Sequence, residues 1–66
     1  MDEIIGLVCR AGGVSQSLDR AAVRAETFHD AGDKNRCESN LDLLLAHIER
    51  LTELAADIRE ARKVQS

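Results

Sequence analysis

Apolar residues recur at alternating spacings of three and four positions along most of this sequence, and this repeat constrains the fold most strongly. Such spacing places apolar side chains on one face of an α-helix, whereas a half-buried strand needs strict alternation. The repeat covers residues 4–28, is interrupted over residues 29–36, and resumes over residues 37–58. The sequence therefore predicts an all-α fold with two amphipathic helices. The repeat positions are Ile4, Leu7, Ala11, Val14, Leu18, Ala21, Ala25, Phe28, Cys37, Leu41, Leu44, Ile48, Leu51, Ala55 and Ile58.

The interruption contains residues that end one helix and begin another. Gly32 suits the left-handed backbone conformation that often follows a helix, and Asp33 is a favourable N-terminal cap for the next helix. Ser39 begins a capping-box pattern and is an alternative cap. We expect one domain with helices over about residues 3–31 and 34–63 of the 66-residue chain. The short loop between them makes the helices antiparallel neighbours.

The chain is too short to build a large core of its own. A chain of 66 residues buries a low fraction of its surface and usually needs a staple or a partner. The apolar stripe of the second helix is also too wide for one neighbour, because Leu45, Leu54 and Ala61 flank its repeat. We expect an antiparallel helical hairpin that self-associates into a twofold-symmetric, dimeric four-helix bundle, resembling ROP-type dimeric hairpins in architecture alone. The expected dimer seam is Leu7, Val14, Leu18, Phe28, Leu41, Leu44, Ile48, Leu51 and Ile58.

Two adjacent glycines, Gly12 and Gly13, lie inside the first helical segment. The repeat continues across them from Ala11 to Val14, which favours one helix that is weakened or kinked there. Each glycine costs about 1 kcal/mol relative to alanine in a helix interior. Two alternatives stay open: a break into two helices, capped by a serine just beyond the glycines, or a close approach of another backbone.

The N-terminal arm, residues 4–13, is apolar or small on nearly every side. Ile5, Val8 and Cys9 lie off the repeat although they are apolar or weakly polar. The arm is either covered by the dimer or exposed as a docking surface for another protein. The candidate partner-binding residues are Ile4, Ile5, Val8, Cys9, Gly12 and Gly13.

The charge balance disfavours nucleic acid and membranes as partners. With 12 acidic and 9 basic residues, the net charge of −3 gives the chain no overall attraction for phosphate or anionic lipid. Arg10, Arg20 and Arg24 are a weak local candidate for phosphate contact, because no aromatic residue lies between them. The apolar run over residues 4–9 is too short to span a bilayer.

The residue types that catalysis or metal binding requires are not grouped in this sequence. His29 and His47 have no further histidine at helical spacing, and no nucleophile has an orienting base. We therefore expect no catalytic residue, cofactor or metal. Cys9 and Cys37 lie near opposite ends of the expected hairpin, too far apart for a disulfide. Reduced thiols are typical of a soluble, cytoplasmic protein.

These features favour a non-enzymatic interaction module, a homodimer that binds and regulates or inhibits a larger protein. Seven arginines against two lysines suit a bacterial or phage genome. Two other functions are kept as alternatives: a dimeric RNA-binding bundle and a purely structural assembly subunit.

Overall fold

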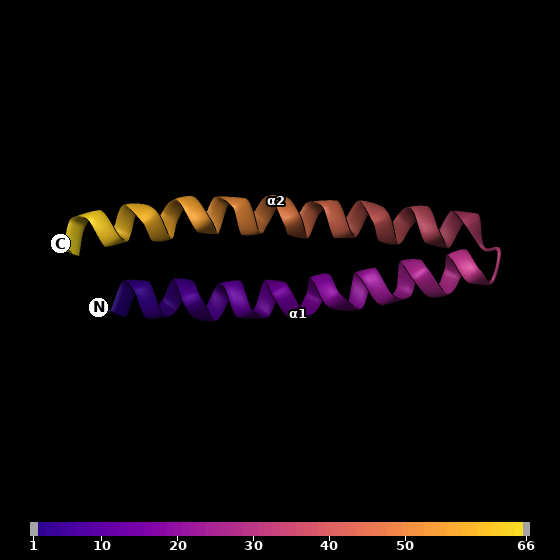
Figure 1. Cartoon of the computed structure of the whole chain (residues 1–66), viewed down its shortest axis with the longest axis horizontal. Coiled ribbons are helices and arrows are strands. Elements are labelled where there is room, and N and C mark those ends of the chain that lie inside the picture. Colours follow the sequence, from indigo (N-terminus) through magenta and orange to yellow (C-terminus); the bar gives the residue numbers. More distant parts are fainter. Residues whose placement is uncertain (1, 66) are drawn as a thin grey trace.

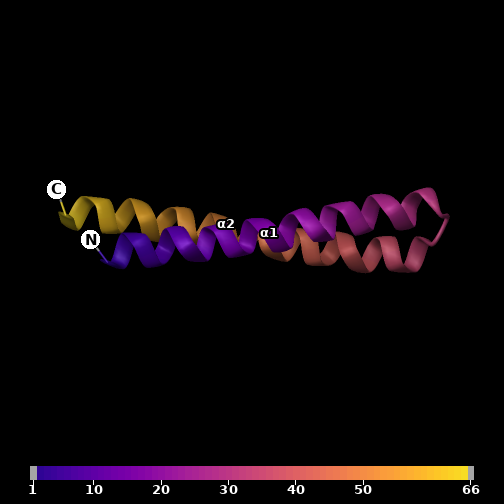
Figure 2. The ribbon, with the colours of Figure 1, turned by 90° about the horizontal axis from the view of Figure 1, so that it is seen from below.

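The chain forms two long antiparallel α-helices joined by a tight turn (Figure 1). This computed structural model describes the backbone of residues 2–65, with α1 over Asp2–Asp30 and α2 over Lys34–Gln65. The hairpin measures 51 × 14 × 11 Å. In the turned view the helices cross at a shallow angle and wrap around each other (Figure 2). The predicted all-α hairpin is confirmed, and we call the end opposite the turn the open end.

Backbone hydrogen bonds fix the turn at the end of α1. Gly32 has a φ of 76°, and its N–H donates to the carbonyl of His29 at 3.1 Å. The N–H of Asp33 donates to the carbonyl of Phe28 at 2.9 Å. This pair of bonds is the Schellman motif, whose left-handed residue is usually glycine because a Cβ is disfavoured there. The prediction that Gly32 follows the first helix is confirmed.

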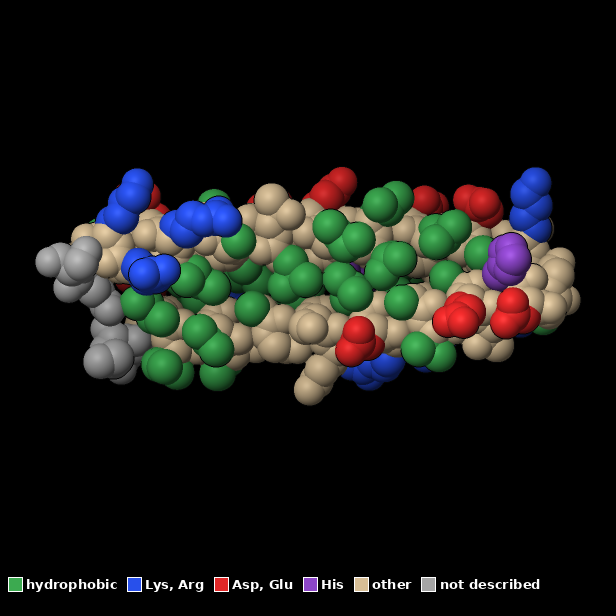
Figure 3. Space-filling model, viewed as in Figure 1, with side chains coloured by type: hydrophobic (Ala, Val, Ile, Leu, Met, Phe, Trp, Pro, Cys, Tyr) green, Lys and Arg blue, Asp and Glu red, His purple; other side chains and the backbone are tan. Residues whose placement is uncertain are grey.

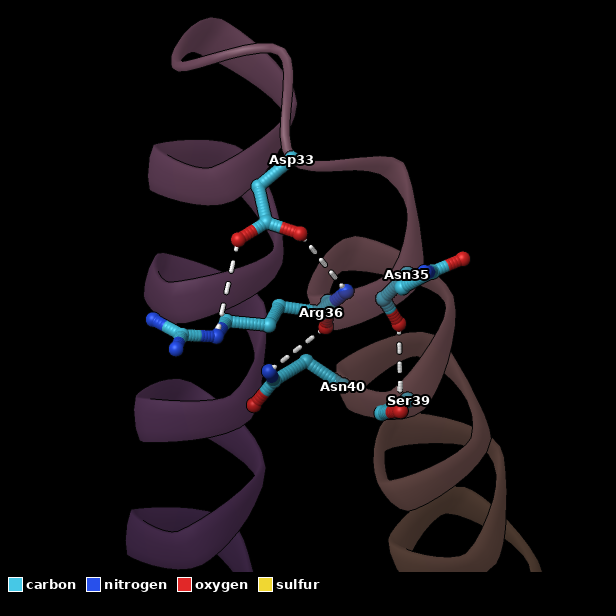
Figure 4. A network of polar contacts seen from close by, with 5 residues as sticks. All are labelled: Asp33, Asn35, Arg36, Ser39 and Asn40. Carbon is cyan, nitrogen blue, oxygen red and sulfur yellow. Dashed lines mark hydrogen bonds and ion pairs between the residues drawn. The ribbon is translucent and has the colours of Figure 1, made fainter.

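Asp33 caps α2, as predicted. Its Oδ1 accepts a hydrogen bond from the N–H of Arg36 at 3.2 Å, and its Oδ2 lies 3.5 Å from Nε of Arg36 (Figure 4). The Arg36 guanidinium lies 5.6 Å from the ring centroid of Phe28, which links the cap to the last turns of α1. Ser39, the alternative cap, lies inside α2, where its Oγ donates to the carbonyl of Asn35 at 3.1 Å.

The two adjacent glycines of α1 do not interrupt it. The helix is continuous through Gly12 and Gly13, so the break into two helices is excluded. A Cβ built at either position would meet no described atom within 4 Å outside the local helix. Nothing within the hairpin therefore approaches these glycines closely.

The face of α1 that packs on α2 is the predicted one. Every repeat position from Ile4 to Phe28 is buried or half-buried. Near the open end, Leu7 forms a cluster with Leu54 and Ala61 of α2, and Leu54 is 1% exposed. Leu54 is the most deeply buried large side chain among the described residues.

The face of α2 that packs on α1 differs from the predicted one. Leu54 and Ala61, which we expected to flank the repeat, are buried at the contact. Leu41 and Ile48 are 37% and 45% exposed, so within the hairpin they do not lie at the contact. We call the residues of α2 that pack on α1 the contact stripe. It consists of Cys37, Asn40, Leu44, His47, Leu51, Leu54, Ile58 and Ala61.

The different rotation of α2 has a simple physical reason. Near the open end the contact stripe supplies Leu54 and Ala61, whereas the predicted repeat continues with Ala55 and then Arg62. Burying leucine rather than alanine removes more apolar surface from water, and an arginine at the contact is costly. Because both stripes keep the same heptad period, this choice also directs Asn40 toward α1 near the turn.

Candidate interaction surface

Among the described residues of α2, five large apolar side chains are exposed in the hairpin: Leu41, Leu43, Leu45, Ile48 and Val64. Leu41, Leu45 and Ile48 are 37%, 57% and 45% exposed. Leu41 and Ile48 belong to a second stripe with spacings of three and four, which we call the open stripe. Its members are Leu41, Leu44, Ile48, Leu51, Ala55 and Ile58.

The open stripe and the contact stripe overlap. Leu44, Leu51 and Ile58 belong to both, and each is half-buried, with one side packed on α1. A helix with two overlapping apolar stripes is typical of a bundle in which it has two helical neighbours. The hairpin provides one of them. Figure 3 shows hydrophobic side chains along the line where the two helices meet on one face of the molecule.

The surface area of the hairpin also indicates an incomplete core. The chain exposes 5046 Å². A compact monomer of 7.2 kDa exposes about 4,100 Å², so the hairpin exposes about 900 Å² more. A standard protein interface buries about 800 Å² of each partner. The excess is therefore of the size that one interface covers.

Charged side chains of both signs lie at each end of α2. Glu38 and Asp42 lie toward the turn, close to Lys34 and Arg36, and all four are exposed. Arg59 and Arg62 lie toward the open end, where they are also exposed. On the face of the molecule that Figure 3 shows, most acidic side chains lie toward the turn, and several basic ones gather at the open end. On this face, a partner meets mainly acidic side chains toward the turn and mainly basic ones at the open end.

The N-terminal arm is divided between the core and the surface. Ile4 is half-buried at the contact with α2, whereas Ile5, Val8 and Cys9 are exposed in the hairpin. The other thiol, that of Cys37, is buried in the contact stripe, and both cysteines are free. The hairpin itself therefore does not cover the off-repeat side chains of the arm.

A polar groove of about 260 Å³ lies between the helices and contains two of the three arginines predicted for phosphate contact. Arg20 and Arg24 line it together with His47 of α2. Arg10 lies apart from them, in another groove of about 480 Å³ that it shares with acidic side chains. The polar groove is lined by Ser17, Arg20, Ala21, Arg24, Asn40, Leu43 and His47.

Sequence reasoning missed the contribution of α2 to the polar groove. Asn40 is buried, and its Nδ2 donates to the carbonyl of Arg36 at 2.8 Å (Figure 4). His47 lies seven residues later, on the same side of α2. The heptad that starts at Asn40 and continues through Leu54 and Ala61 was the signal that could have found both residues.

Within the part of the chain that the structure describes, no group of three or more His, Cys, Asp or Glu side chains is placed to hold a metal ion. Neither helix, over residues 2–65, has an apolar stretch long enough to cross a membrane. Comparison with known proteins finds no matching family model and no significantly similar curated protein or solved structure.

Proposed function

We propose that this chain is a non-enzymatic protein-interaction module. In this proposal the hairpin self-associates into a dimeric four-helix bundle, and the bundle binds and regulates or inhibits a larger protein. The open stripe carries the proposal, because it presents a helical apolar surface that α1 covers only in part. Apolar surface of this kind commonly marks a protein-binding site.

Burial of the exposed leucines and isoleucine favours association. Complete burial of such a side chain contributes about 1.5–3 kcal/mol. Leu41, Leu45 and Ile48 are roughly half exposed, so covering each one contributes roughly 1 kcal/mol per copy. The half-buried Leu44, Leu51 and Ile58 add to this contribution. The gain increases with each side chain that a neighbouring helix covers, which favours a partner that runs along the whole stripe.

The side of the N-terminal arm that carries Ile5 and Cys9 is the surface that we assign to the larger protein. Ile5 and Cys9 are exposed and point away from the contact with α2. Both lie in the first three turns of α1, near the open end of the molecule. A target that docks there contacts apolar side chains next to the charged end of α2.

Co-purification from the native cell tests this assignment. A tagged chain should retain the larger protein, whereas an Ile5→Ser variant should lose it and keep its own oligomeric state. Val23→Ser is a matched control, because Val23 is a large exposed apolar residue of α1 outside the arm. Undiminished binding by Ile5→Ser would remove the arm from the target surface. If both variants bring down only further copies of the chain, the result would favour a structural assembly subunit.

The polar groove gives a specific reason to test RNA as a second candidate partner. It brings Arg20 and Arg24 together with His47, and the dimer would carry two such grooves. Contacts with phosphate weaken steeply as salt rises, whereas burial of apolar surface does not. Binding to structured RNA that falls with salt and is lost in Arg24→Ala would favour this second candidate. We expect no such binding at physiological salt.

A further inference from the structure

We infer that the open stripe is covered by a second copy of this chain that runs in the opposite direction. In this arrangement each α2 lies against the α2 of the partner, and each turn lies beside the partner's open end. The inference rests on the proposed function, because it requires the open stripe to be an interface. It adds the orientation of the second copy and the residue pairs at the contact.

The open stripe is self-complementary when it is reversed. Its spacing is symmetric about the point between Glu49 and Arg50. When a second copy runs in the opposite direction and shares this midpoint, Leu41 lies opposite the partner's Ile58. The other pairs of the stripe lie between this pair and the midpoint. Each layer thus brings apolar side chains together, as an antiparallel helix pair requires. The remaining layers pair Leu44 with Ala55 and Ile48 with Leu51.

The charges beside the stripe favour the same orientation. Glu38 and Arg59 flank the stripe on one side of α2 and are both exposed. In the reversed arrangement, Glu38 of each copy lies near Arg59 of the other, so the twofold axis creates two ion pairs. Turn-beside-turn packing instead brings Glu38 close to Glu26 of the other copy's α1. Exposed ion pairs add little affinity but can set the orientation of an interface.

One side of α1 fits the same twofold axis. Ile4, Val8 and Ala11 begin a second palindromic set of positions, with its midpoint between Gln16 and Ser17. Because Leu7 packs near Ile58, this midpoint lies within roughly 1.5 Å of the α2 midpoint along the hairpin. The reversed arrangement of the second copy covers the exposed Val8 and places small residues of the two α1 helices opposite one another. The facing positions are Val8 with Ala25, Ala11 with Ala22, Ser15 with Leu18, and Ile4 with His29.

A distance between the two turns tests the orientation. A nitroxide label on Lys34→Cys, in a Cys9→Ser, Cys37→Ala background, reports this distance by pulsed electron resonance. Lys34 is exposed and lies next to the turn. The reversed arrangement predicts about 45 Å between labels, given the helical rise of about 1.5 Å per residue. A distance below about 25 Å, from the same rise, would overturn the orientation and leave self-association standing. A monomer would overturn both.

Charge-reversal substitutions test the ion pair between Glu38 and Arg59 without spin labels. Glu38→Arg and Arg59→Glu should each raise the dissociation constant of the dimer roughly tenfold, as expected when attraction becomes repulsion at two symmetric sites. The double variant should return to within about twofold of the original value, because each pair is restored with reversed signs. Glu53→Arg, away from the open stripe, controls for the change in net charge. Tighter association of Glu38→Arg would indicate turn-beside-turn packing and contradict the inference.

Discussion

Leu54 and Ile48 lie on the same helix but in opposite environments: Leu54 is 1% exposed against α1, whereas Ile48 is 45% exposed. Both side chains are large and apolar, so the difference comes from the rotation of α2 about its axis. That rotation buries the contact stripe and leaves the open stripe available to a second neighbour. The interaction that we propose follows from this division of α2.

Truncating a buried and an exposed leucine of α2 should have unequal effects on hairpin stability. Leu54→Ala should lower the free energy of unfolding by about 2–5 kcal/mol, because it leaves a cavity beside Leu7. Leu45→Ala, at a position that is 57% exposed in the hairpin, should cost less than about 1.5 kcal/mol. Urea unfolding at one fixed protein concentration measures both variants. Equal losses would mean that Leu45 is as deeply buried as Leu54.

Alanine at the two adjacent glycines should stabilise the protein. Gly12→Ala and Gly13→Ala should each raise the free energy of unfolding by about 1 kcal/mol, because alanine is the better helix former. Neither new methyl group meets a described atom of the hairpin. Gly32→Ala is the contrasting control and should destabilise, since its φ is 76°. Destabilisation by the Gly12 and Gly13 changes would reveal a close backbone contact with another chain.

The cap of α2 should contribute measurably to stability. Asp33→Ala removes the acceptor for the Arg36 N–H and should cost about 1 kcal/mol. Asp33→Asn keeps an oxygen acceptor and should retain most of the stability. Ser39→Ala, inside α2, is the matched control and should change stability by less than about 0.5 kcal/mol. Thermal unfolding of the three variants compares them directly, and a larger loss for Ser39→Ala would contradict this assignment of the cap.

The two thiols should differ in reactivity. Cys9 is exposed and should react quickly with a thiol reagent in the folded protein, whereas the buried Cys37 should react only as the protein unfolds. Counting modified thiols per chain over time distinguishes them. Rapid modification of one thiol is the expected result. Protection of both would show that another chain covers the N-terminal arm.

The sequence predicted the hairpin, its turn and the packed face of α1. These predictions succeeded because each follows from local features of the sequence: Gly32 suits a left-handed residue, Asp33 next to it suits a cap, and the repeat of α1 runs unbroken from Ile4 to Phe28. The rotation of α2 had two solutions with the same spacing, one through Leu54 and the other through Ala55. Spacing alone does not distinguish them. Packing against Leu7 distinguishes the two solutions, and that contact between α1 and α2 is seen only in the folded structure.

The polar groove and the exposed N-terminal arm were predictable from the sequence only in part. Arg20 and Arg24 lie one helical turn apart, so the sequence alone placed them together. Their meeting with Asn40 and His47 depends on the rotation of α2, which the sequence left open. The sequence also did not decide whether the N-terminal arm is exposed or covered. Ile5 faces away from α2, so only another chain can cover it.

Sedimentation equilibrium at micromolar concentration tests the central claim, that the open stripe is an interface. The unmodified chain should sediment with at least twice its mass of 7.2 kDa. Ile48→Ser should stay helical by circular dichroism and shift toward the monomer, because it removes an apolar side chain that the hairpin does not bury. Val23→Ser, an exposed position of α1 outside the open stripe, should sediment like the unmodified chain. A folded, stable monomer for the unmodified chain, or a dimer that Ile48→Ser leaves equally tight, would contradict the claim.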